Sequence, residues 1–277
     1  MVLATKFSFN AQPGNPNAGG NGRKNIYRAI EGSLRRLQTD YIDLYWMHVW
    51  DMMTPVEDVL ASLDTLVQAG KVRYIGLSDV PAWYVARAQT LAEQQGRERI
   101  AALQLEYFLV QRSIEREHIP AAQELGIALC PWSPLADGLL SGKHRRGAQP
   151  GPTEGRLEIQ KAAGTTIFER DTDWNWKIVD VLLEVSKEIR RPSAELALNW
   201  VATQPGVTSI IIGATKISQL DSNLSSFDFT IPAGLRARLQ KASELDPAVQ
   251  PYAFFTSTLQ ARVKGNAAIL AWTRDIR

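Results

Sequence analysis

Residues 40–79 contain one complete strand–helix–strand unit, and this unit decides the fold class. It begins with Asp40-Tyr41-Ile42-Asp43-Leu44-Tyr45-Trp46-Met47-His48 and ends with Lys71-Val72-Arg73-Tyr74-Ile75-Gly76-Leu77-Ser78-Asp79. Both segments are largely apolar, which is typical of parallel strands that are covered on both faces. Between them, Thr54-Pro55-Val56-Glu57 predicts a helix start, in which Thr54 caps the helix and Glu57 completes a capping box. Gly70 predicts the end of that helix.

The same alternation of strands and helices continues in both directions along the chain. We expect strands at Val2–Thr5, Tyr41–Met47, Val72–Leu77, Ala101–Leu105, Ile127–Trp132 and Thr208–Ile212. We expect further helices at Arg23–Leu37, Ala82–Gln95, Glu117–Leu125, Trp174–Ile189, Ala194–Thr203, Ser218–Ser226 and Ala233–Leu245. This order, without a change in composition, predicts one α/β domain. The loops Asn10–Gly22 and Ala136–Thr172 are long, and such loops are usually functional lids or disordered segments.

Composition and charge exclude several classes of protein. The 277 residues suffice for an α/β barrel, which usually needs about 250. A net charge of +2 gives no electrostatic reason to expect a nucleic acid or an anionic membrane as partner. The single cysteine, Cys130, and three scattered histidines exclude an intramolecular disulfide and a local metal motif. Because we find neither a signal peptide nor a membrane-spanning stretch, we expect a cytoplasmic protein.

Polar side chains stand where four of the predicted strands end. Lys6 ends the first strand and His48 the second, Ser78-Asp79 the third, and Gln104 to Tyr107 the fourth. The carboxyl ends of parallel strands are where α/β proteins build their sites. Each residue alone is compatible with a solvated lysine or a structural histidine, so the prediction of a site depends on the whole set.

In this order and spacing, the four strand ends resemble those of the aldo-keto reductase family. The resemblance continues through Pro131-Trp132-Ser133-Pro134-Leu135, Gly138-Leu139-Leu140-Ser141-Gly142-Lys143 and Ile210-Ile211-Ile212-Gly213-Ala214-Thr215-Lys216, and it closes with Gln219-Leu220 and Asn223-Leu224. It covers Val2 to about Leu245 and is similar to the bacterial and potassium-channel-β-like branch, which favours Trp before Ser-Pro-Leu. The resemblance implies a (β/α)₈ TIM barrel that uses NADPH to reduce small aldehydes and ketones.

The resemblance also implies individual roles. Lys6 matches the catalytic lysine, whose charge lowers the pKa of a tyrosine general acid, and His48 matches the histidine that orients the substrate carbonyl. Three residues would hold the nicotinamide carboxamide: Ser78, Asp79 and Gln104. Asparagine is commoner than aspartate at the position of Asp79.

The remaining predicted cofactor residues suit a flat ring and a diphosphate. An aromatic face such as Trp132 can fix a nicotinamide ring, although a core aromatic residue is the alternative. Glycines let backbone N–H groups approach phosphate, and a helix N-terminus favours an anion. The other residues predicted to bind the cofactor are Ser133, Pro134, Leu135, Gly138, Ser141, Lys143, Gly213, Ala214, Thr215, Lys216, Gln219 and Asn223.

Basic residues bear on the choice between NADPH and NADH. Lys143 begins the run Lys143-His144-Arg145-Arg146, which is either a solvated charged face or a site for the diphosphate or the adenosine 2′-phosphate. Lys216 and Arg156 are further candidates for that phosphate. Thr215 stands where many relatives carry arginine, and NADPH is still favoured over NADH.

The chain as given starts at the lysine strand of the family pattern. In the family, an aspartate and a tyrosine general acid follow the second barrel strand, upstream of that point. We therefore expect residues 1–277 to form one N-terminally incomplete barrel domain, with about six βα units (strands 3–8) and a tail at 246–277. Tyr45 is three residues before His48 and so points to the opposite face, and we do not assign Tyr107 as a replacement acid.

Three interpretations of this start are open. The chain is part of a longer active reductase, or an inactive fragment, or a non-catalytic module that binds a nicotinamide cofactor and completes its barrel through a partner. An unrelated phosphate-binding barrel would explain Gly213 but not Lys6 together with His48. The oligomeric state is open as well.

Overall fold

A computed structural model of the chain describes residues 1–144, 146 and 169–265. Its strands are parallel and form one sheet in the sequential order β1-β2-β3-β4-β5. The strands are β1 Ala4–Phe7, β2 Ile42–Met47, β3 Val72–Ser78, β4 Ile100–Gln104 and β5 Ala128–Leu129. The helices are α1 Arg23–Leu37, α2 Val56–Gln68, α3 Ala82–Gln95, α4 His118–Leu125, α6 Asp173–Ile189, α7 Ser193–Ala202, α8 Ile217–Ser225, α9 Ala233–Ala242 and α10 Ser257–Lys264. The 3₁₀ helices are η1 Pro16–Ala18, η2 Ser113–Glu115, η3 Ala136–Ser141 and η4 Tyr252–Phe255.

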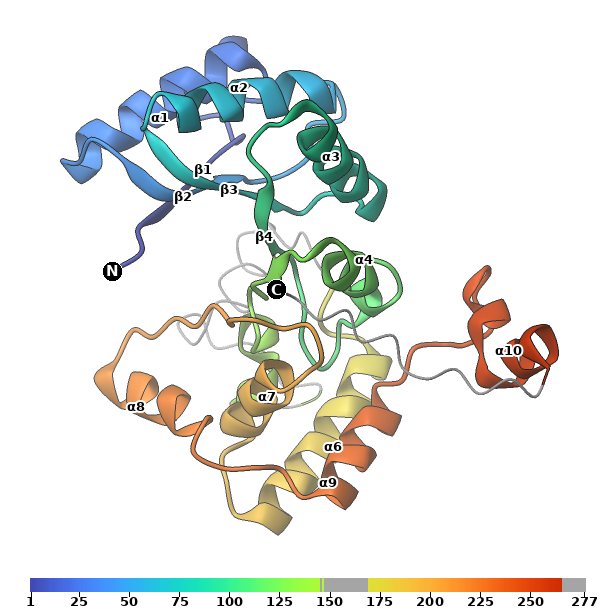
Figure 1. The fold of residues 1–277 in the computed structure, drawn as a ribbon. Helices are drawn as coiled ribbons and strands as arrows, with labels where there is room; N and C mark the ends of the chain where they lie inside the picture. The colour runs from blue at the N-terminus through green and yellow to red at the C-terminus, as the bar shows by residue number, and fades with distance from the viewer. Residues whose placement is uncertain (145, 147–168, 266–277) are drawn as a thin grey trace.

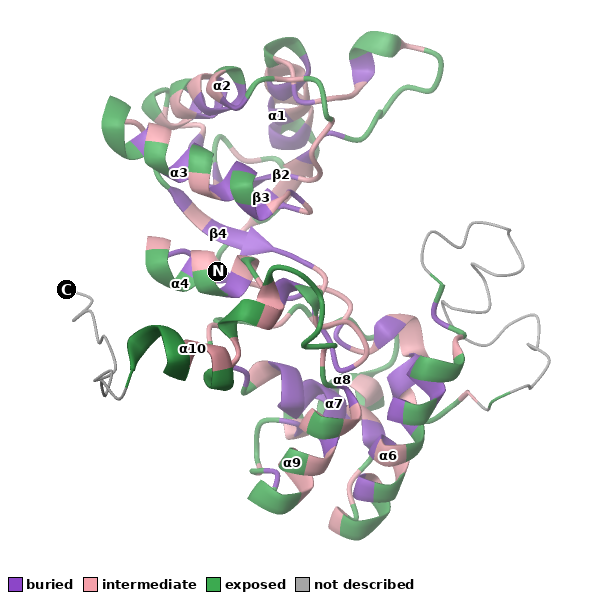
Figure 2. Ribbon diagram, turned by 90° about the vertical axis from the view of Figure 1, so that its right-hand side faces the viewer, coloured by how far each residue is buried: buried purple, intermediate pink, exposed green. Residues whose placement is uncertain are grey.

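The helices α1, α2 and α3 cover one face of the strands β1 to β3 (Figure 1). The side chains between these layers form the core; Tyr45, Ile75, Leu77 and Leu103 are almost completely buried. Figure 2 colours the ribbon by burial, with buried residues in purple. On α1, the predicted apolar stripe of Ile26, Ile30 and Leu34 is buried. The predicted α/β class, with parallel strands separated by helices, is therefore confirmed.

The register of the sheet brings polar residues onto the opposite face. Lys6 pairs with Trp46, Trp46 pairs with Gly76, and Ser78 pairs with Gln104. Side chains at paired positions of neighbouring strands point to the same side, and alternate residues along each strand do so too. One face of the sheet is therefore apolar and packed on helices, and the other carries the predicted site.

Two local predictions are wrong. β1 begins two residues later than expected, so Lys6 lies within the strand. The helix α2 starts at Val56 with Pro55 at the N-cap, and Thr54 does not cap it. Instead the Thr54 hydroxyl donates to Asp51 Oδ2 at 2.7 Å, and the Thr54 backbone N–H donates to Asp51 Oδ1. Both hydrogen bonds hold Thr54 in a turn before the helix.

The strand predicted at Thr208–Ile212 does not form either. This segment has a single bridge, between Val207 and Leu129, and Ile211 N donates to Pro131 O at 2.9 Å. β5 is only two residues long, and Pro131 after it has no N–H to donate, so a ladder cannot extend. The segment still runs parallel to β5, on the side of β5 away from β4. Within the described residues, the sheet does not close on itself.

The predicted loop Asn10–Gly22 contains η1 and is ordered by side-chain hydrogen bonds among Asn10, Gln12 and Asn15. Most of the predicted loop Ala136–Thr172, including Arg145 and Arg156, lies outside the described residues. None of the helices in the described part combines the length and the apolar character needed to span a membrane.

Candidate cofactor and catalytic site

Lys6 lies on the open face of the sheet, in the middle of the predicted site. Its ammonium Nζ donates to Gln104 Oε1 and lies 5.6 Å from the centroid of the Trp46 ring. Burial lowers the pKa of Lys6 to about 8, although the carboxylate of Asp79 acts in the opposite direction. The structure thus joins the predicted catalytic lysine directly to a residue predicted to bind the cofactor.

The Trp46 ring beneath Lys6 depends on a glycine in the next strand. An added Cβ at Gly76 would lie 2.4 Å from Trp46 Cε3 and 2.5 Å from Cζ3. Only a residue without a side chain lets the ring lie against the backbone of β3, and Trp46 is 3% exposed there. Gly76 therefore supports the indole on which Lys6 is placed.

His48 follows β2 and is fixed through its backbone. Its N–H donates to Ser8 Oγ at 3.1 Å, and the Ser8 hydroxyl donates to Asn21 Oδ1 at 2.6 Å. Asn21 Nδ2 in turn donates to Val49 O at 2.9 Å. Ser8 and Asn21 were not predicted as site residues, because Ser8 follows the end of β1 with a φ of 107° and strand alternation gives no information on its direction.

The imidazole of His48 is neutral over the physiological range. Burial and then the charge of Lys6 lower the pKa of His48 to about 4. The ring of Phe9 meets it edge-on, with the two centroids 4.6 Å apart. A neutral histidine beside an ammonium can offer a hydrogen bond to a carbonyl oxygen.

Asp79 and Trp132 form the next part of the site. Trp132 Nε1 donates to Asp79 Oδ1 at 3.0 Å, and the Ser78 hydroxyl donates to Asp79 Oδ2 at 3.3 Å. Burial raises the pKa of Asp79, and the Trp132 and Ser78 hydrogen bonds and Lys6 oppose that shift. Asp79 has a left-handed backbone, with φ of 46°, which turns the chain away from β3. Lys6 thus contacts Gln104, and Asp79 contacts Trp132. Residues that were predicted singly, on separate strands, lie together in the structure.

The predicted diphosphate loop follows Trp132 and has an unusual backbone. Ser133, Ala136, Asp137 and Gly138 all have left-handed φ values between 51° and 106°. Pro134 and Leu135 lie in this loop, and Ser141 Oγ donates to Gly138 O at 2.6 Å. An added Cβ at Gly142 would lie 2.7 Å from Ser193 Oγ, so Gly142 lets the end of η3 pack on α7. Lys143, the next residue, is exposed.

The second predicted phosphate segment is exposed and is held by α8. It comprises Gly213, Ala214, Thr215 and Lys216. Gln219 Oε1 accepts from Thr215 N at 2.9 Å, and Asn223 Nδ2 donates to Gly213 O at 3.4 Å. Gln219 and Asn223 therefore shape the segment. The hydrogen bond from Ile211 to Pro131 places it next to the chain that enters the first phosphate loop.

The two tyrosines considered as replacement acids lie elsewhere. Tyr45 is fully buried against α1, where its hydroxyl donates to Ile26 O at 3.3 Å. Tyr107 donates to Glu115 Oε1 at 2.6 Å. Burial raises the pKa of both phenols. The expectation that Tyr45 points to the face opposite His48 is confirmed.

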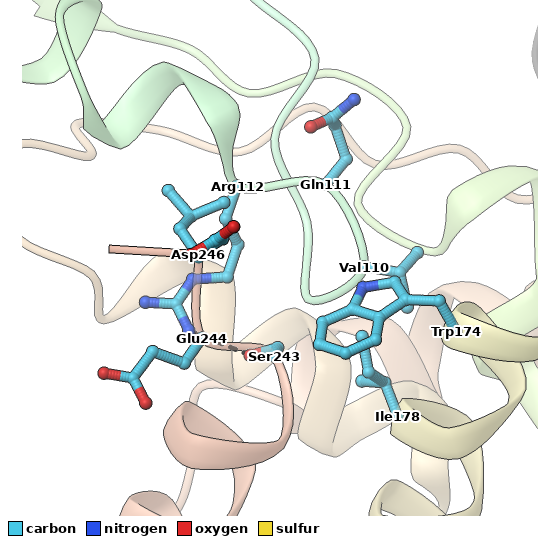
Figure 3. Close-up of a pocket in the computed structure, with 9 residues that line it drawn as sticks. Val110, Gln111, Arg112, Trp174, Ile178, Ser243, Glu244 and Asp246 are labelled. Atoms are coloured by element: carbon cyan, nitrogen blue, oxygen red, sulfur yellow. Dashed lines mark hydrogen bonds between the residues drawn. The ribbon is translucent and has the colours of Figure 1, made fainter. Parts of the chain in front are cut away.

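A cavity of about 430 Å³ lies outside this site (Figure 3). Its walls come from the segment 110–112, the start of α6 and the residues after α9. Trp174 and Ile178 form one side, and Arg112 is fixed opposite by Glu115 and Ser243. No residue of the predicted site lines it.

Comparisons with known proteins identify the family of this chain. A sequence profile described as the Aldo/keto reductase family matches residues 1–244. The uncharacterized oxidoreductase YrpG of Bacillus subtilis is 35% identical over 83% of this chain and 68% of its own length. An aryl-alcohol dehydrogenase [NADP(+)] of Phanerodontia chrysosporium is 31% identical, over 83% of this chain and 61% of its own length. A probable voltage-gated potassium channel subunit beta of Oryza sativa subsp. japonica is 33% identical, over 82% of this chain and 68% of its own length.

This chain thus spans about two thirds of the length of these relatives. The profile match covers the lysine strand, the histidine strand and both phosphate segments. The chain therefore belongs to the aldo/keto reductase family.

Proposed function

We propose that this protein is an NADP(H)-dependent oxidoreductase that reduces aldehydes or ketones to alcohols by hydride transfer. One observation carries the proposal: Lys6 donates to Gln104 on the same sheet face where Trp132 donates to Asp79. The residue expected to be the catalytic lysine and the groups expected to hold a nicotinamide are therefore neighbours. Residues 1–277 as one domain, and a cytoplasmic location, are part of the same proposal.

The hydrogen-bonding groups of Asp79 and Gln104 suit a nicotinamide carboxamide. That group presents one carbonyl acceptor and an amide with two donors. The Asp79 carboxylate accepts, whereas Gln104, whose Oε1 is taken by Lys6, offers its amide nitrogen as a donor. The indole of Trp132, held by Asp79, offers a flat aromatic face to the ring. Aspartate in place of the commoner asparagine therefore keeps the chemistry that the site needs.

The phosphate end supports NADPH over NADH. The loop at 133–138 contains four residues with left-handed φ, a backbone form that occurs in anion-binding turns, although the N–H groups of Ala136 and Gly138 already donate to Ser133 O and Leu135 O. Lys143 and Lys216 are exposed cations on the two phosphate segments, where an adenosine 2′-phosphate needs positive charge. The fungal relative whose name includes NADP(+) supports the same choice.

The chain's own residues prepare a carbonyl for reduction, and the bound cofactor supplies the hydride. Because the pKa of Lys6 is about 8, its Nζ holds a proton and a positive charge at neutral pH. This charge would stabilise the negative charge that develops on the carbonyl oxygen, and the Nζ proton would pass to that oxygen to complete the alcohol, with solvent returning a proton to Lys6. Neutral His48, fixed through Ser8, orients the same oxygen by a hydrogen bond.

Aromatic carbonyl compounds are the substrate class that we propose. Phe9 is 65% exposed and packs edge-on against His48, so an aromatic surface lies beside the proposed reacting position. Aromatic rings prefer this kind of neighbour. The aryl-alcohol dehydrogenase among the relatives points in the same direction.

The test is the oxidation of NADPH in the presence of an aromatic aldehyde, followed by absorbance. We expect turnover by the unmodified chain and a loss of about 10²–10⁴ in Lys6→Met, the size of effect typical of a proton-transfer group. Lys24→Met removes an exposed lysine on α1 and should leave turnover unchanged. Equal rates in the two variants would contradict the role of Lys6.

A second function is supported by the plant relative described as a potassium channel subunit beta. In this case the chain binds the nicotinamide cofactor and serves as a binding module. The oxidation assay, together with a measurement of NADPH binding, separates the two functions. A chain that binds NADPH tightly but does not oxidise it with aromatic aldehydes is a binding module.

A further inference from the structure

A buried cluster of three charged side chains lies behind the proposed cofactor site. Arg170, 5% exposed, pairs through Nη2 with Glu106 Oε1 and through Nε with Asp137 Oδ2 at 3.4 Å. Its guanidinium also lies 4.9 Å from the centroid of the Phe108 ring. Charges this deeply buried are costly to separate from their partners, so the three groups act as a unit.

The two carboxylates belong to different halves of the proposed site. Glu106 lies two residues after Gln104 and forms a parallel bridge with Trp132, which places it in the nicotinamide half. Asp137 lies in the diphosphate loop, where its Oδ1 accepts from the Ser133 hydroxyl at 3.2 Å. Arg170 is therefore the group that joins the strand end to the loop.

The arginine is itself well anchored. Its carbonyl accepts from Asn175 Nδ2 at 3.0 Å, and Thr172 caps α6 by accepting from Asn175 N at 3.1 Å. Asp137 has a left-handed φ of 57°, a conformation that is uncommon for residues with side chains, although aspartate adopts it more readily than most. The ion pair with Arg170 is one of the contacts that hold it.

We propose that Arg170 is a positioning residue for the cofactor: it fixes the diphosphate loop to the nicotinamide half and neutralises two buried carboxylates whose negative charge would otherwise oppose the binding of an anionic diphosphate. This inference rests on the proposed function. Arg170 touches no reacting atom, so its loss weakens cofactor binding and leaves the binding of the carbonyl substrate largely unchanged.

The test measures the Kd of NADPH by quenching of tryptophan fluorescence. We expect Arg170→Met to raise this Kd by about tenfold or more, because two buried carboxylates lose their counterion. In the triple variant Arg170→Met, Glu106→Gln, Asp137→Asn, most of the loss should be recovered, since the repulsive charge is removed. A merely structural role for Arg170 predicts instead that Arg170→Met lowers the free energy of unfolding but leaves the Kd of the folded protein for NADPH unchanged.

The matched control is Arg238→Met. Arg238 also pairs with two carboxylates, Glu184 and Glu188, but on the surface of α6 and α9. The Arg238→Met substitution should leave the Kd of NADPH unchanged. In steady-state assays, Arg170→Met should raise the KM for NADPH and not the KM for the aldehyde.

The outcomes are distinct. If the unmodified chain does not bind NADPH, the proposed function fails. If the unmodified chain binds and Arg170→Met binds equally well, or if the triple variant binds no better than Arg170→Met, this inference fails. Should Arg170→Met not fold by circular dichroism, Arg170→Lys and the triple variant decide: the lysine keeps the positive charge and the triple variant removes all three charges, so both should keep most of the affinity for NADPH. A Kd raised by about tenfold or more in either variant overturns the inference.

Discussion

Gly76→Ala is the substitution for which the structure predicts the largest effect from the smallest change. The added methyl would lie 2.4 Å from Trp46 Cε3, whereas an ordinary contact needs at least 3.4 Å. Either the indole or β3 must therefore move by about 1 Å in a region where Trp46 is 3% exposed. Overpacking of this kind costs about 1–3 kcal/mol in the free energy of unfolding. Because Lys6 lies over the same ring, turnover should fall as well.

The assay is urea unfolding followed by far-ultraviolet circular dichroism, with Gly234→Ala as the control. Gly234 lies in α9 with no heavy atom within 4 Å of an added Cβ, so alanine there should be neutral or stabilise by up to about 1 kcal/mol. The two substitutions are chemically identical, but only Gly76→Ala should lower the free energy of unfolding. If Gly76→Ala is as stable as the unmodified chain, to within about 0.5 kcal/mol, the described packing of Trp46 is wrong.

Three further predictions concern the polar residues of the site. Reduction should slow as the pH rises through about 8, where Lys6 loses its charge; a rate that is level from pH 7 to 10 would contradict the pKa of about 8. The stability of the fold should fall as the pH drops from about 6.5 to 4, because His48 has a folded-state pKa of about 4 and the unfolded chain binds a proton first; His48→Gln should flatten this slope in thermal unfolding. Asn21→Ala should cost about 1–3 kcal/mol in urea unfolding, since it leaves buried polar groups without a partner, whereas exposed Asn17→Ala should cost little; equal values would refute the described contacts.

The elements that sequence analysis predicts best are those with long periodic patterns. The stripe on α1 and the helix α3 were predicted at their observed bounds, because packing on the sheet selects a periodic apolar face. The segment 208–212 was predicted as a strand because it is apolar. Whether a strand forms depends on its partner, however, and β5 is too short to provide one.

The residues of the candidate site also differ in whether the sequence could predict them. His48, Asp79 and Gln104 stand at strand ends, a position that sequence alone can assign, whereas Lys6 lies one residue before the end of β1. Arg170 could not be found by such reasoning, because it meets a carboxylate 64 residues away across the fold. Ser8 and Asn21 were missed because a loop brings them together, and loop geometry is not periodic.

The central claim, hydride transfer from a nicotinamide cofactor to a carbonyl carbon, has one direct test. The chain is incubated with an aromatic aldehyde and NADPH that carries deuterium at the transferable position, and the alcohol product is examined by mass spectrometry. We predict an alcohol that contains one deuterium on its carbinol carbon, with the label absent when Lys6→Met is used at the same concentration. An alcohol without deuterium, or no alcohol from a chain that is folded and binds NADPH, would contradict the account.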